Sequence, residues 1–306
     1  MKGLVIKSTG SWYQVLSDTG QRVDCRIQGK FRLKDIKTTN PIAVGDRVEF
    51  ELEPELETGV ITQLEERKNY IIRKSVNLSK QAQIIAANLD QAFLIVTLAS
   101  PRTSLGFIDR FLVTAEAYDI PASLIFNKLD LFSDEGLEIL AEYEQIYTDL
   151  GYPCYHVSAK EGKNIEQIKT LLKDKVTLIS GHSGVGKSTL INAILPEAEV
   201  KTGAVSDWSD KGQHTTTFAE MYSLPFGGYL IDTPGIRELG VFDIEPQELG
   251  RLFPEFRERM GDCRFHNCRH INEPGCAVLT ALENGEIEPS RYDSYLSIYH
   301  GNETRN

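Results

Sequence analysis

The chain has 306 residues, of which 41% are hydrophobic and 25% are charged, and this composition excludes a fully disordered chain and a fibrous repeat. At roughly 150 residues per domain, the length predicts about two domains with room for a small third. The net charge of -11 argues against attraction of the whole surface to nucleic acid or anionic lipid, so any RNA contact has to be local. The longest apolar run, 92–99, is far shorter than the ~20 residues that span a bilayer, and the N-terminus lacks the apolar core of a signal peptide. We therefore expect a soluble, cytoplasmic protein without a membrane partner.

Residues 1–68 alternate short strands with turn signals, and strands are expected over 4–6, 12–16, 22–27, 47–51 and 59–62. Five short strands in so small a segment suit a closed β-barrel of the OB or SH3 type. Six basic residues interleaved with an aromatic residue predict a local basic face, which is either a nucleic-acid contact or an ordinary solvated rim. This basic face comprises Arg22, Arg26, Lys30, Phe31, Arg32, Lys34 and Lys37.

Residues 69–241, after a linker over 65–69, alternate buried strands with helices, which is the pattern of an α/β domain. The continuous apolar runs at 92–98 and 122–126 predict parallel strands that are covered on both faces. The other elements expected are strands over 176–179 and 228–231 and helices over 105–118, 135–150, 164–172 and 187–195.

Residues 242–306 lack the strand pattern and predict a third, helical domain. Helices are expected over 246–260, 277–283 and 290–299, with a loop rich in cysteine and histidine after the first of them.

A phosphate-binding loop is predicted between the strand at 176–179 and the helix at 187–195, because Gly181–Ser188 fits the pattern G-x-x-x-x-G-K-[ST]. The glycines let successive backbone N–H groups turn toward phosphate oxygens. Lys187 reaches the β- and γ-phosphates, which makes it a catalytic candidate as well, and Ser188 offers its hydroxyl to Mg²⁺. The residues expected against the nucleotide here are Gly181, His182, Ser183, Gly184, Val185, Gly186, Lys187, Ser188 and Thr189.

The choice of base is predicted by Asn127-Lys128-Leu129-Asp130, an N-K-x-D arrangement that follows the strand at 122–126. In this arrangement the Asp130 carboxylate accepts hydrogen bonds from both N1–H and the 2-amino group of guanine. Adenine has no such pair of donors, and a site built to pair them rejects it. Ser158-Ala159-Lys160 matches the S-A-K loop, whose backbone meets the guanine O6. The three motifs together predict that GTP is bound.

Magnesium and the γ-phosphate require two further segments. Asp232-Thr233-Pro234-Gly235 fits D-x-x-G, in which Asp232 holds Mg²⁺ through water and the Gly235 N–H meets the γ-phosphate. The segment 212–217 supplies switch hydroxyls. Thr216 is the favoured Mg²⁺ ligand, and Thr215 stays open as the alternative.

The order of the motifs differs from that of most small GTPases, because N-K-x-D and S-A-K precede the phosphate-binding loop. The GTPase domain is therefore predicted to be circularly permuted, which the closeness of folded termini permits. The chain leaves this domain just after Gly235 and runs directly into the helical domain. We expect GTP hydrolysis to be mechanically linked to the position of that domain.

The catalytic residue is less evident than the binding residues. Ile236 occupies the position where many GTPases carry a water-orienting Gln, so slow intrinsic turnover is expected. His214 is the candidate that orients the attacking water, and Gln213 is the alternative. A third interpretation is that His214 is a switch-loop residue with no role in catalysis. Gly184 stands where GTPases stimulated by K⁺ carry Asn, so no K⁺ dependence is predicted.

Three cysteines of the five in the chain crowd into the last domain and predict a metal site. Cys263-x4-Cys268-x-His270-x5-Cys276 offers three thiolates and one imidazole, a set suited to tetrahedral structural Zn²⁺. By spacing alone, His266 competes with His270 for the fourth position.

Taken together, the barrel, the permuted GTPase motifs, the segment Gln213–Thr217 and the Cys/His spacing resemble the bacterial ribosome small-subunit-dependent GTPase A family over nearly the whole chain. The resemblance implies an OB-fold barrel, a permuted GTPase domain and a zinc-finger domain in which His270 is the ligand. It implies GTP hydrolysis stimulated by the small ribosomal subunit, a checkpoint role in late maturation of that subunit, and ribosomal RNA as a partner of a monomeric protein. The alternatives are a GTP-dependent switch with negligible catalysis on another RNA or protein, and an ATP-using small-molecule kinase, which N-K-x-D disfavours.

Overall fold

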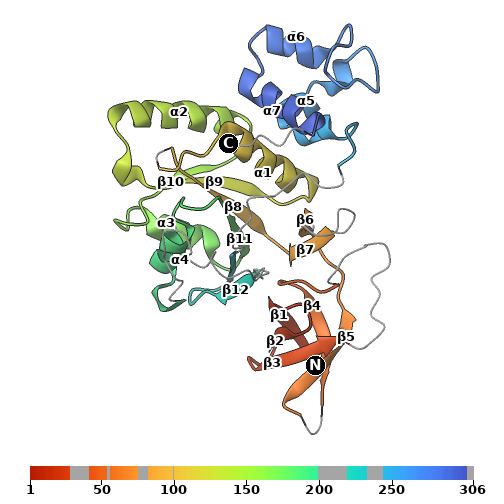
Figure 1. Cartoon of the computed structure of the whole chain (residues 1–306), viewed down its shortest axis with the longest axis vertical. Coiled ribbons are helices and arrows are strands. Elements are labelled where there is room, and N and C mark those ends of the chain that lie inside the picture. The colour runs from red at the N-terminus through yellow and green to blue at the C-terminus, as the bar shows by residue number, and fades with distance from the viewer. Residues whose placement is uncertain are drawn as a thin grey trace, which may run out of the picture.

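The computed structural model describes residues 1–27, 41–53, 56–74, 82–98, 100–198, 219–232 and 244–301. The predictions for Lys30–Lys37, for Gln213, His214, Thr215 and Thr216, and for Thr233–Ile236 lie outside the described residues. The described parts form three regions, with the barrel at the bottom of Figure 1, the α/β domain in the middle and the helical domain at the top. Within these residues, no helix combines the length and the apolar character needed to cross a membrane.

The N-terminal region is a closed barrel, as predicted. Its strand order is β1-β2-β3-β5-β4 with β4 returning to β1, and only β3 and β5 run parallel. This closure is that of an OB-type barrel. Alternate side chains fill its interior, among them Val15, Phe50 and Ile61. The strands are β1 (Lys2–Ser8), β2 (Tyr13–Ser17), β3 (Arg22–Ile27), β4 (Arg47–Leu52) and β5 (Thr58–Leu64).

A hairpin that the sequence pattern did not predict follows the barrel, formed by β6 (Tyr70–Lys74) and β7 (Ala82–Ala87). It is tied to the barrel because the Ala87 N–H donates to the Val44 carbonyl at 2.9 Å. Gly45 has φ +91°, and a Cβ at this position would lie 2.1 Å from the Ala87 carbonyl oxygen, so only glycine permits the approach.

The segment expected to be a linker is likewise anchored to the barrel. Arg67 donates from two nitrogens to the carboxylate of Asp46, at 2.7 and 2.6 Å, and from Nη2 to the Pro41 carbonyl at 2.8 Å. Asp46 is fully buried, so this bidentate pair fixes where the chain leaves the barrel.

The central sheet has the order β10-β9-β8-β11-β13-β12 and is parallel except for β12, which pairs antiparallel with β13. All six residues of β8 are buried, which confirms the expectation from its apolar run. The parallel strands β8, β9 and β10 precede β11 in the chain, which agrees with the predicted order of the motifs. The strands are β8 (Gln91–Val96), β9 (Ala122–Phe126), β10 (Cys154–His156), β11 (Val176–Ser180), β12 (Glu220–Ser223) and β13 (Tyr229–Asp232).

Helices cover both faces of this sheet, and β8 shows how the faces are divided. Leu94 packs with α1 and α2, whereas its neighbours Phe93 and Ile95 pack with α3 and α4, as the two-residue period of a strand requires. Figure 1 shows α2 above the strands β9 and β10 and α3 below them. The helices are α1 (Leu105–Ala117), α2 (Asp134–Asp149), α3 (Ile165–Leu172) and α4 (Lys187–Ile194).

The barrel and the α/β domain share a single sheet. Strand β1 pairs antiparallel with β12, where Lys7 stands opposite Glu220 and their side chains form an ion pair of 3.3 Å. The strand β12 was not predicted, since its short sequence Glu-Met-Tyr-Ser carries no alternation long enough to detect.

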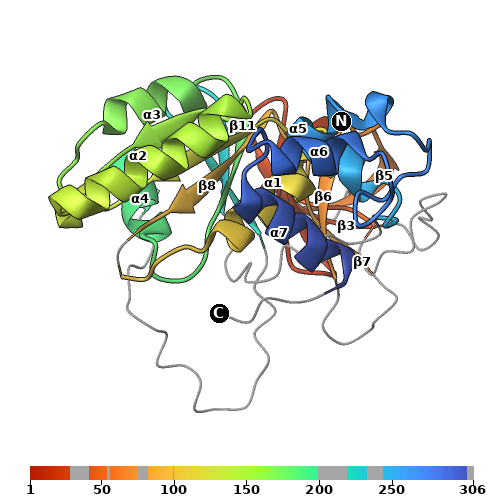
Figure 2. The ribbon, with the colours of Figure 1, turned by 90° about the horizontal axis from the view of Figure 1, so that it is seen from above.

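The helical region differs from the prediction in one place. The helix expected over 246–260 is wrong, because the structure has a short 3₁₀ turn, Leu249–Leu252, then α5 (Pro254–Arg257) and a second 3₁₀ turn, Met260–Asp262. Pro254 has no N–H to donate within a longer helix and starts a new one instead. Helices α6 (Ala277–Glu283) and α7 (Pro289–Tyr299) match the prediction, and α7 lies beside α1 in both Figure 1 and Figure 2.

Candidate nucleotide and metal sites

The predicted phosphate-binding loop lies where the sequence places it, between the end of β11 at Ser180 and the start of α4 at Lys187. Gly186 has φ +93°, and a Cβ there would lie 2.4 Å from Nδ2 of Asn127. The loop therefore passes so close to the N-K-x-D segment that a side chain is excluded at this position.

The Lys187 side chain folds back into this loop. Its Nζ donates to the carbonyl oxygens of Gly181 and His182, the latter at 3.1 Å. Burial lowers the pKa of Lys187, and the nearby carboxylate of Asp232 opposes that change. A cation is thus held at the centre of the loop, where the phosphates of a nucleotide bind in this motif.

Asn127 joins the three nucleotide motifs. Its Nδ2 donates to the Val185 carbonyl at 2.9 Å, and its Oδ1 accepts from the Ala159 N–H at 3.0 Å. Only 1% of Asn127 is exposed, so both bonds are shielded from water. One side chain consequently sets the spacing between the phosphate-binding loop and the segments that would bind the base.

Asp130 is oriented by the S-A-K loop. The Ser158 hydroxyl donates to Asp130 Oδ1 at 2.6 Å and accepts from the Glu161 N–H at 3.2 Å. Lys128 adopts a left-handed conformation, with φ +66°, and its Nζ donates to the Ser100 carbonyl at 2.6 Å. Lys160 is exposed beside them. The geometry leaves the other oxygen of Asp130 available to a base.

The residues predicted to hold Mg²⁺ are described only in part. Asp232 ends β13 directly beside Ile179 of β11, is 7% exposed and influences the Lys187 ammonium. Ser188 and Thr189 are the second and third residues of α4. A carboxylate and a hydroxyl next to a phosphate-binding loop are the oxygen donors that Mg²⁺ prefers, so this pair fits the ion. Thr215, Thr216, Gly235 and His214 lie outside the described residues.

Sequence reasoning missed one neighbour of the phosphate-binding loop, the segment between β8 and α1. Thr103, which is fully buried, lies with its Oγ1 2.8 Å from Nε2 of His182. No motif marks Thr103, and the only local signal is Ser104, which caps α1 by accepting from the Phe107 N–H.

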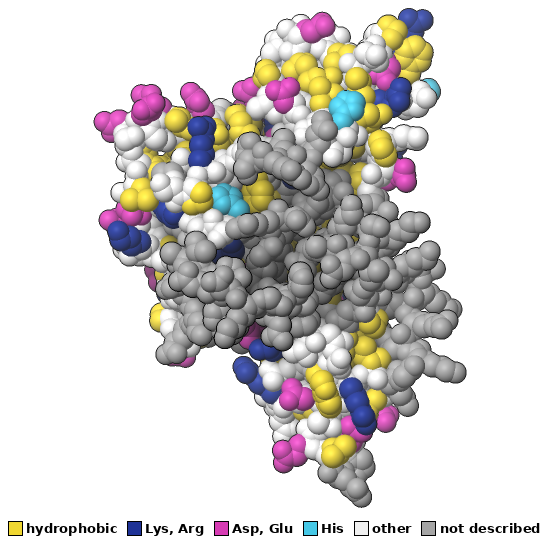
Figure 3. Space-filling view, in the orientation of Figure 1, with side chains coloured by type: hydrophobic (Ala, Val, Ile, Leu, Met, Phe, Trp, Pro, Cys, Tyr) yellow, Lys and Arg dark blue, Asp and Glu magenta, His cyan; other side chains and the backbone are white. Residues whose placement is uncertain are grey.

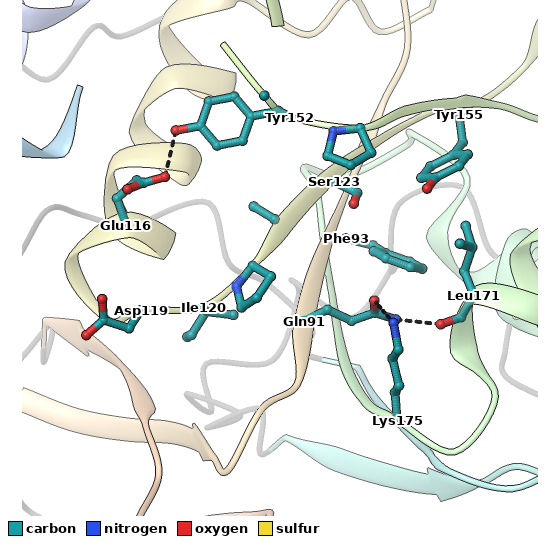
Figure 4. Close-up of a pocket in the computed structure, with 14 residues that line it drawn as sticks. Gln91, Phe93, Glu116, Asp119, Ile120, Ser123, Tyr152, Tyr155, Leu171 and Lys175 are labelled. Carbon is teal, nitrogen blue, oxygen red and sulfur yellow. Dashed lines mark hydrogen bonds between the residues drawn. The ribbon is translucent and has the colours of Figure 1, made fainter. Parts of the chain in front are cut away.

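A cavity of about 590 Å³ opens at the opposite edge of the sheet, where the parallel strands begin (Figure 4). Gln91 at the start of β8 and Ala122 at the start of β9 line it, and Glu116 there accepts a hydrogen bond of 3.1 Å from the Tyr152 hydroxyl. No residue of the predicted nucleotide motifs lines this cavity. Ligands of such sheets bind at the carboxyl ends of the strands, so the cavity is distinct from the nucleotide site.

The Cys/His cluster converges on one point. The ligand atoms of Cys263, Cys268, His270 and Cys276 all lie within 4.8 Å of one another. His270 Nδ1 is 3.7 Å from Cys263 Sγ and 3.3 Å from Cys276 Sγ, and the two sulfurs are 4.0 Å apart. A tetrahedron of such ligands around zinc has edges of about 3.5–3.8 Å, so the four residues fit Zn²⁺.

The two histidines that spacing left as alternatives have different environments. His270 is 1% exposed, and its backbone carbonyl accepts a bond of 2.8 Å from the Tyr292 hydroxyl. His266 is exposed and lies outside the converging group. Cys276 Sγ also accepts from the Leu279 N–H at 3.4 Å, so the cluster caps α6.

Comparison with known proteins agrees with this geometry. Residues 64–242 match the model of the RsgA GTPase, and residues 2–61 match that of the RsgA N-terminal domain. The small ribosomal subunit biogenesis GTPase RsgA 2 of Bacteroides thetaiotaomicron is 57% identical over 298 residues, which cover 97% of this chain and 96% of the relative. The small ribosomal subunit biogenesis GTPase RsgA of Christiangramia forsetii is 57% identical over 305 residues, 99% of this chain and 97% of the relative.

Two solved structures share the fold. YjeQ from Thermotoga maritima is 39% identical with a TM-score of 0.79, and the match covers 100% of this chain and 99% of that one. YloQ, described as a circularly permuted GTPase, is 32% identical with a TM-score of 0.73 and coverage of 100% and 96%. The barrel, the permuted motif order and the expected family are thereby confirmed. The chain belongs to the RsgA GTPase family.

Proposed function

We propose that this chain binds GTP at the carboxyl edge of its parallel sheet, hydrolyses it to GDP and phosphate, and acts as a checkpoint in the late maturation of the small ribosomal subunit, which stimulates the hydrolysis. The observation that carries the choice of nucleotide is the Asp130 carboxylate, oriented by Ser158 at 2.6 Å and tied through Asn127 to the phosphate-binding loop. The names of the relatives, small ribosomal subunit biogenesis GTPases, support the place of action.

Phosphoryl transfer needs positioning and electrostatic stabilisation more than covalent chemistry from the protein. In the proposed site, the loop Gly181–Ser188 holds the phosphates and Lys187 stabilises the charge that develops on them. Ser188, Asp232 and Thr216, with Thr215 as the alternative, would hold Mg²⁺, and the ion would supply positive charge to the phosphates. The Gly235 N–H meets the γ-phosphate.

The attacking water is proposed to be oriented by His214, with Gln213 as the alternative. His214→Ala is expected to remove subunit-stimulated turnover and to retain GTP binding. Full stimulated turnover in this variant would rule out His214.

The zinc set is proposed to be structural, with Cys263, Cys268, His270 and Cys276 as a closed shell that leaves no position for a substrate. Arginines lie around it, and Arg264 stacks over the exposed ring of Phe265 at 5.5 Å. We propose that these arginines and the basic face of the barrel contact ribosomal RNA and that the chain acts as a cytoplasmic monomer. Of the basic face, Arg22 and Arg26 are described and exposed, and Arg26 is paired with Glu53.

The test is turnover of GTP and of ATP, each with and without purified small subunits. The proposal predicts slow GTP turnover alone, an increase with small subunits and no ATP turnover in either case. GTP binding without turnover under both conditions would instead favour a pure binding switch, and ATP turnover would favour the kinase.

A further inference from the structure

The phosphate-binding loop is held from the side by the segment that leads into α1. His182 of the loop contacts one residue of this segment and one residue of α1. Its Nε2 is 2.8 Å from the Thr103 hydroxyl, and its ring meets that of Phe107 edge-on, at 5.5 Å between centroids and 88° between planes. The same residue offers its backbone carbonyl to Lys187.

The partners of His182 show which side chain donates in its hydrogen bond with Thr103. Nδ1 lies 3.1 Å from the Ser183 carbonyl, which can only accept, so the proton of the neutral ring belongs on Nδ1. Nε2 is then an acceptor, and the Thr103 hydroxyl donates to it. The hydroxyl oxygen meanwhile accepts from the Thr97 N–H at 3.1 Å, so it is bonded on both sides and holds the ring in one orientation.

The other side of α1 is clamped to the helical domain by a buried charged cluster. Asp109 of α1, fully buried, accepts from Arg291 Nη1 of α7 at 2.7 Å, from the Ser294 hydroxyl, and from the Tyr147 hydroxyl of α2 at 2.9 Å. Arg291 is 1% exposed and also donates to Glu255 at 2.8 and 3.2 Å. Burial lowers the pKa of Arg291, but the two carboxylates more than offset this, so the guanidinium stays protonated.

The two contacts lie on opposite sides of one rigid element. Phe107 and Asp109 are two residues apart, which in an α-helix means a rotation of about 200° and a rise of about 3 Å. One side of α1 therefore touches the phosphate-binding loop while the other is fixed to α7. A displacement of either neighbour has to be accommodated by the other, because close-packed contacts do not deform continuously.

We propose that Thr103 is a positioning residue that couples the phosphate-binding loop to α1, and that α1 transmits nucleotide binding to the zinc-bearing helical domain through the Asp109–Arg291 pair. This route is separate from the chain exit after Gly235. It rests on the proposed binding of GTP, and by linkage a partner bound to the helical domain alters the phosphate-binding loop by the same coupling free energy.

The experiment measures amide hydrogen exchange in α7 of the full-length, zinc-loaded chain, with and without a non-hydrolysable GTP analogue, alongside the dissociation constant of that analogue. In the wild type the analogue is expected to slow exchange in α7 by about 5-fold or more, the lower end of typical coupling between sites. Thr103→Val, which keeps the shape and removes the hydroxyl, is expected to abolish most of this slowing. Thr103→Ser, which restores the hydroxyl, is expected to recover it.

A second variant tests the contact between α1 and α7. Asp109→Asn removes the charge that joins α1 to α7 but leaves Arg291 paired with Glu255, so no buried charge is left unpaired. It is expected to bind the analogue and to lose the response in α7. Ser297→Ala, which removes the bond of 3.2 Å from Arg110 between the same two helices, is the control and is expected to keep the response.

An equal response of α7 in wild type, Thr103→Val and Asp109→Asn would overturn the inference. Binding of the analogue by the wild type with no response in α7 would also overturn it while leaving the proposed function intact. Failure of the wild type to bind the analogue would instead contradict the proposed function.

Discussion

At the scale of single residues, the proposed specificity for guanine depends on one carboxylate and the hydroxyl that orients it. Ser158 donates to Asp130 Oδ1, and Asn127 ties this pair to the phosphate-binding loop. A site that is already organised before binding discriminates by leaving a polar group unpaired when the wrong base enters.

Asp130→Asn is therefore expected to weaken GTP binding by about 10²-fold or more, since the new amide N–H₂ faces the 2-amino group of guanine. Xanthosine triphosphate carries a carbonyl in place of that amino group and is expected to bind the variant better than the wild type. Dissociation constants for both nucleotides check this. Asp134→Asn, at the exposed start of α2, is the matched control, and similar losses in the two variants would contradict the role of Asp130.

Motif residues could be predicted from the sequence because their chemistry depends on local spacing. Asn127 and Asp130 follow β9, Lys187 opens α4 and Asp232 ends β13, close to where their motifs predict them. Thr103 and Asp109 could not be predicted, because their partners are 79 and 182 residues away and no spacing records such contacts. Spacing also left His266 beside His270, since only folding shows which ring is buried.

At the scale of elements, α1 and α7 are joined by a charged cluster rather than by apolar contacts alone. Arg291 stands between two carboxylates in a nearly dry interface. Removing the arginine, the cation of this cluster, is costly because both carboxylates then stay buried without a counterion.

Arg291→Met is expected to destabilise the chain by about 3–5 kcal/mol, because Asp109 and Glu255 stay buried without their cation. Arg257→Met breaks an ion pair with Glu116 in which the arginine side chain is 52% exposed, so it is expected to cost only about 0–1 kcal/mol. Urea unfolding followed by far-ultraviolet circular dichroism measures both changes. Equal decreases in the free energy of unfolding would show that the buried cluster stabilises the chain no more than the exposed ion pair does.

The proposed zinc set lies at the start of α6, where Cys276 is both one of the four converging residues and the N-cap of the helix. Purified chain is expected to hold about one zinc ion, and Cys276→Ser to lose it together with the exchange protection of α6. Cys154→Ser, in the half-buried strand β10, is the control and is expected to keep the metal. The zinc content of each variant and the amide hydrogen exchange of α6 are the measurements. Full zinc content in Cys276→Ser would argue against Cys276 as a ligand.

Helices and strands could be predicted where the element was long enough for its hydrophobic pattern to repeat. Helices α1, α2 and α7 carry enough turns for the apolar positions to repeat, whereas β6, β7 and β12 are too short to show a repeat, and β12 pairs in addition with β1 at the other end of the chain. The helix expected over 246–260 was wrong because apolar spacing outweighed Pro254 in the interpretation, while in the folded chain Pro254 interrupts the helix.

At the scale of the whole molecule, the net charge of -11 is distributed unevenly. Helix α2 carries six acidic residues and no basic one, and Figure 3 shows acidic side chains gathered over it at the upper left. The net charge of the whole chain therefore does not describe each surface. Helix α2 and the barrel, with its proposed RNA contacts, lie in different regions of the molecule. The continuous sheet through β1 and β12 joins the barrel to the GTPase domain, while α1 joins that domain to α7 of the helical domain.

The proposed checkpoint requires that the bound nucleotide control the affinity of the whole chain for the small subunit. The most direct test is the affinity of the full-length chain for purified small ribosomal subunits, measured with a non-hydrolysable GTP analogue and with GDP. Binding is predicted to be tighter with the analogue by about 10-fold or more, a coupling within the usual range. Equal affinity in the two nucleotide states would contradict a checkpoint driven by GTP hydrolysis.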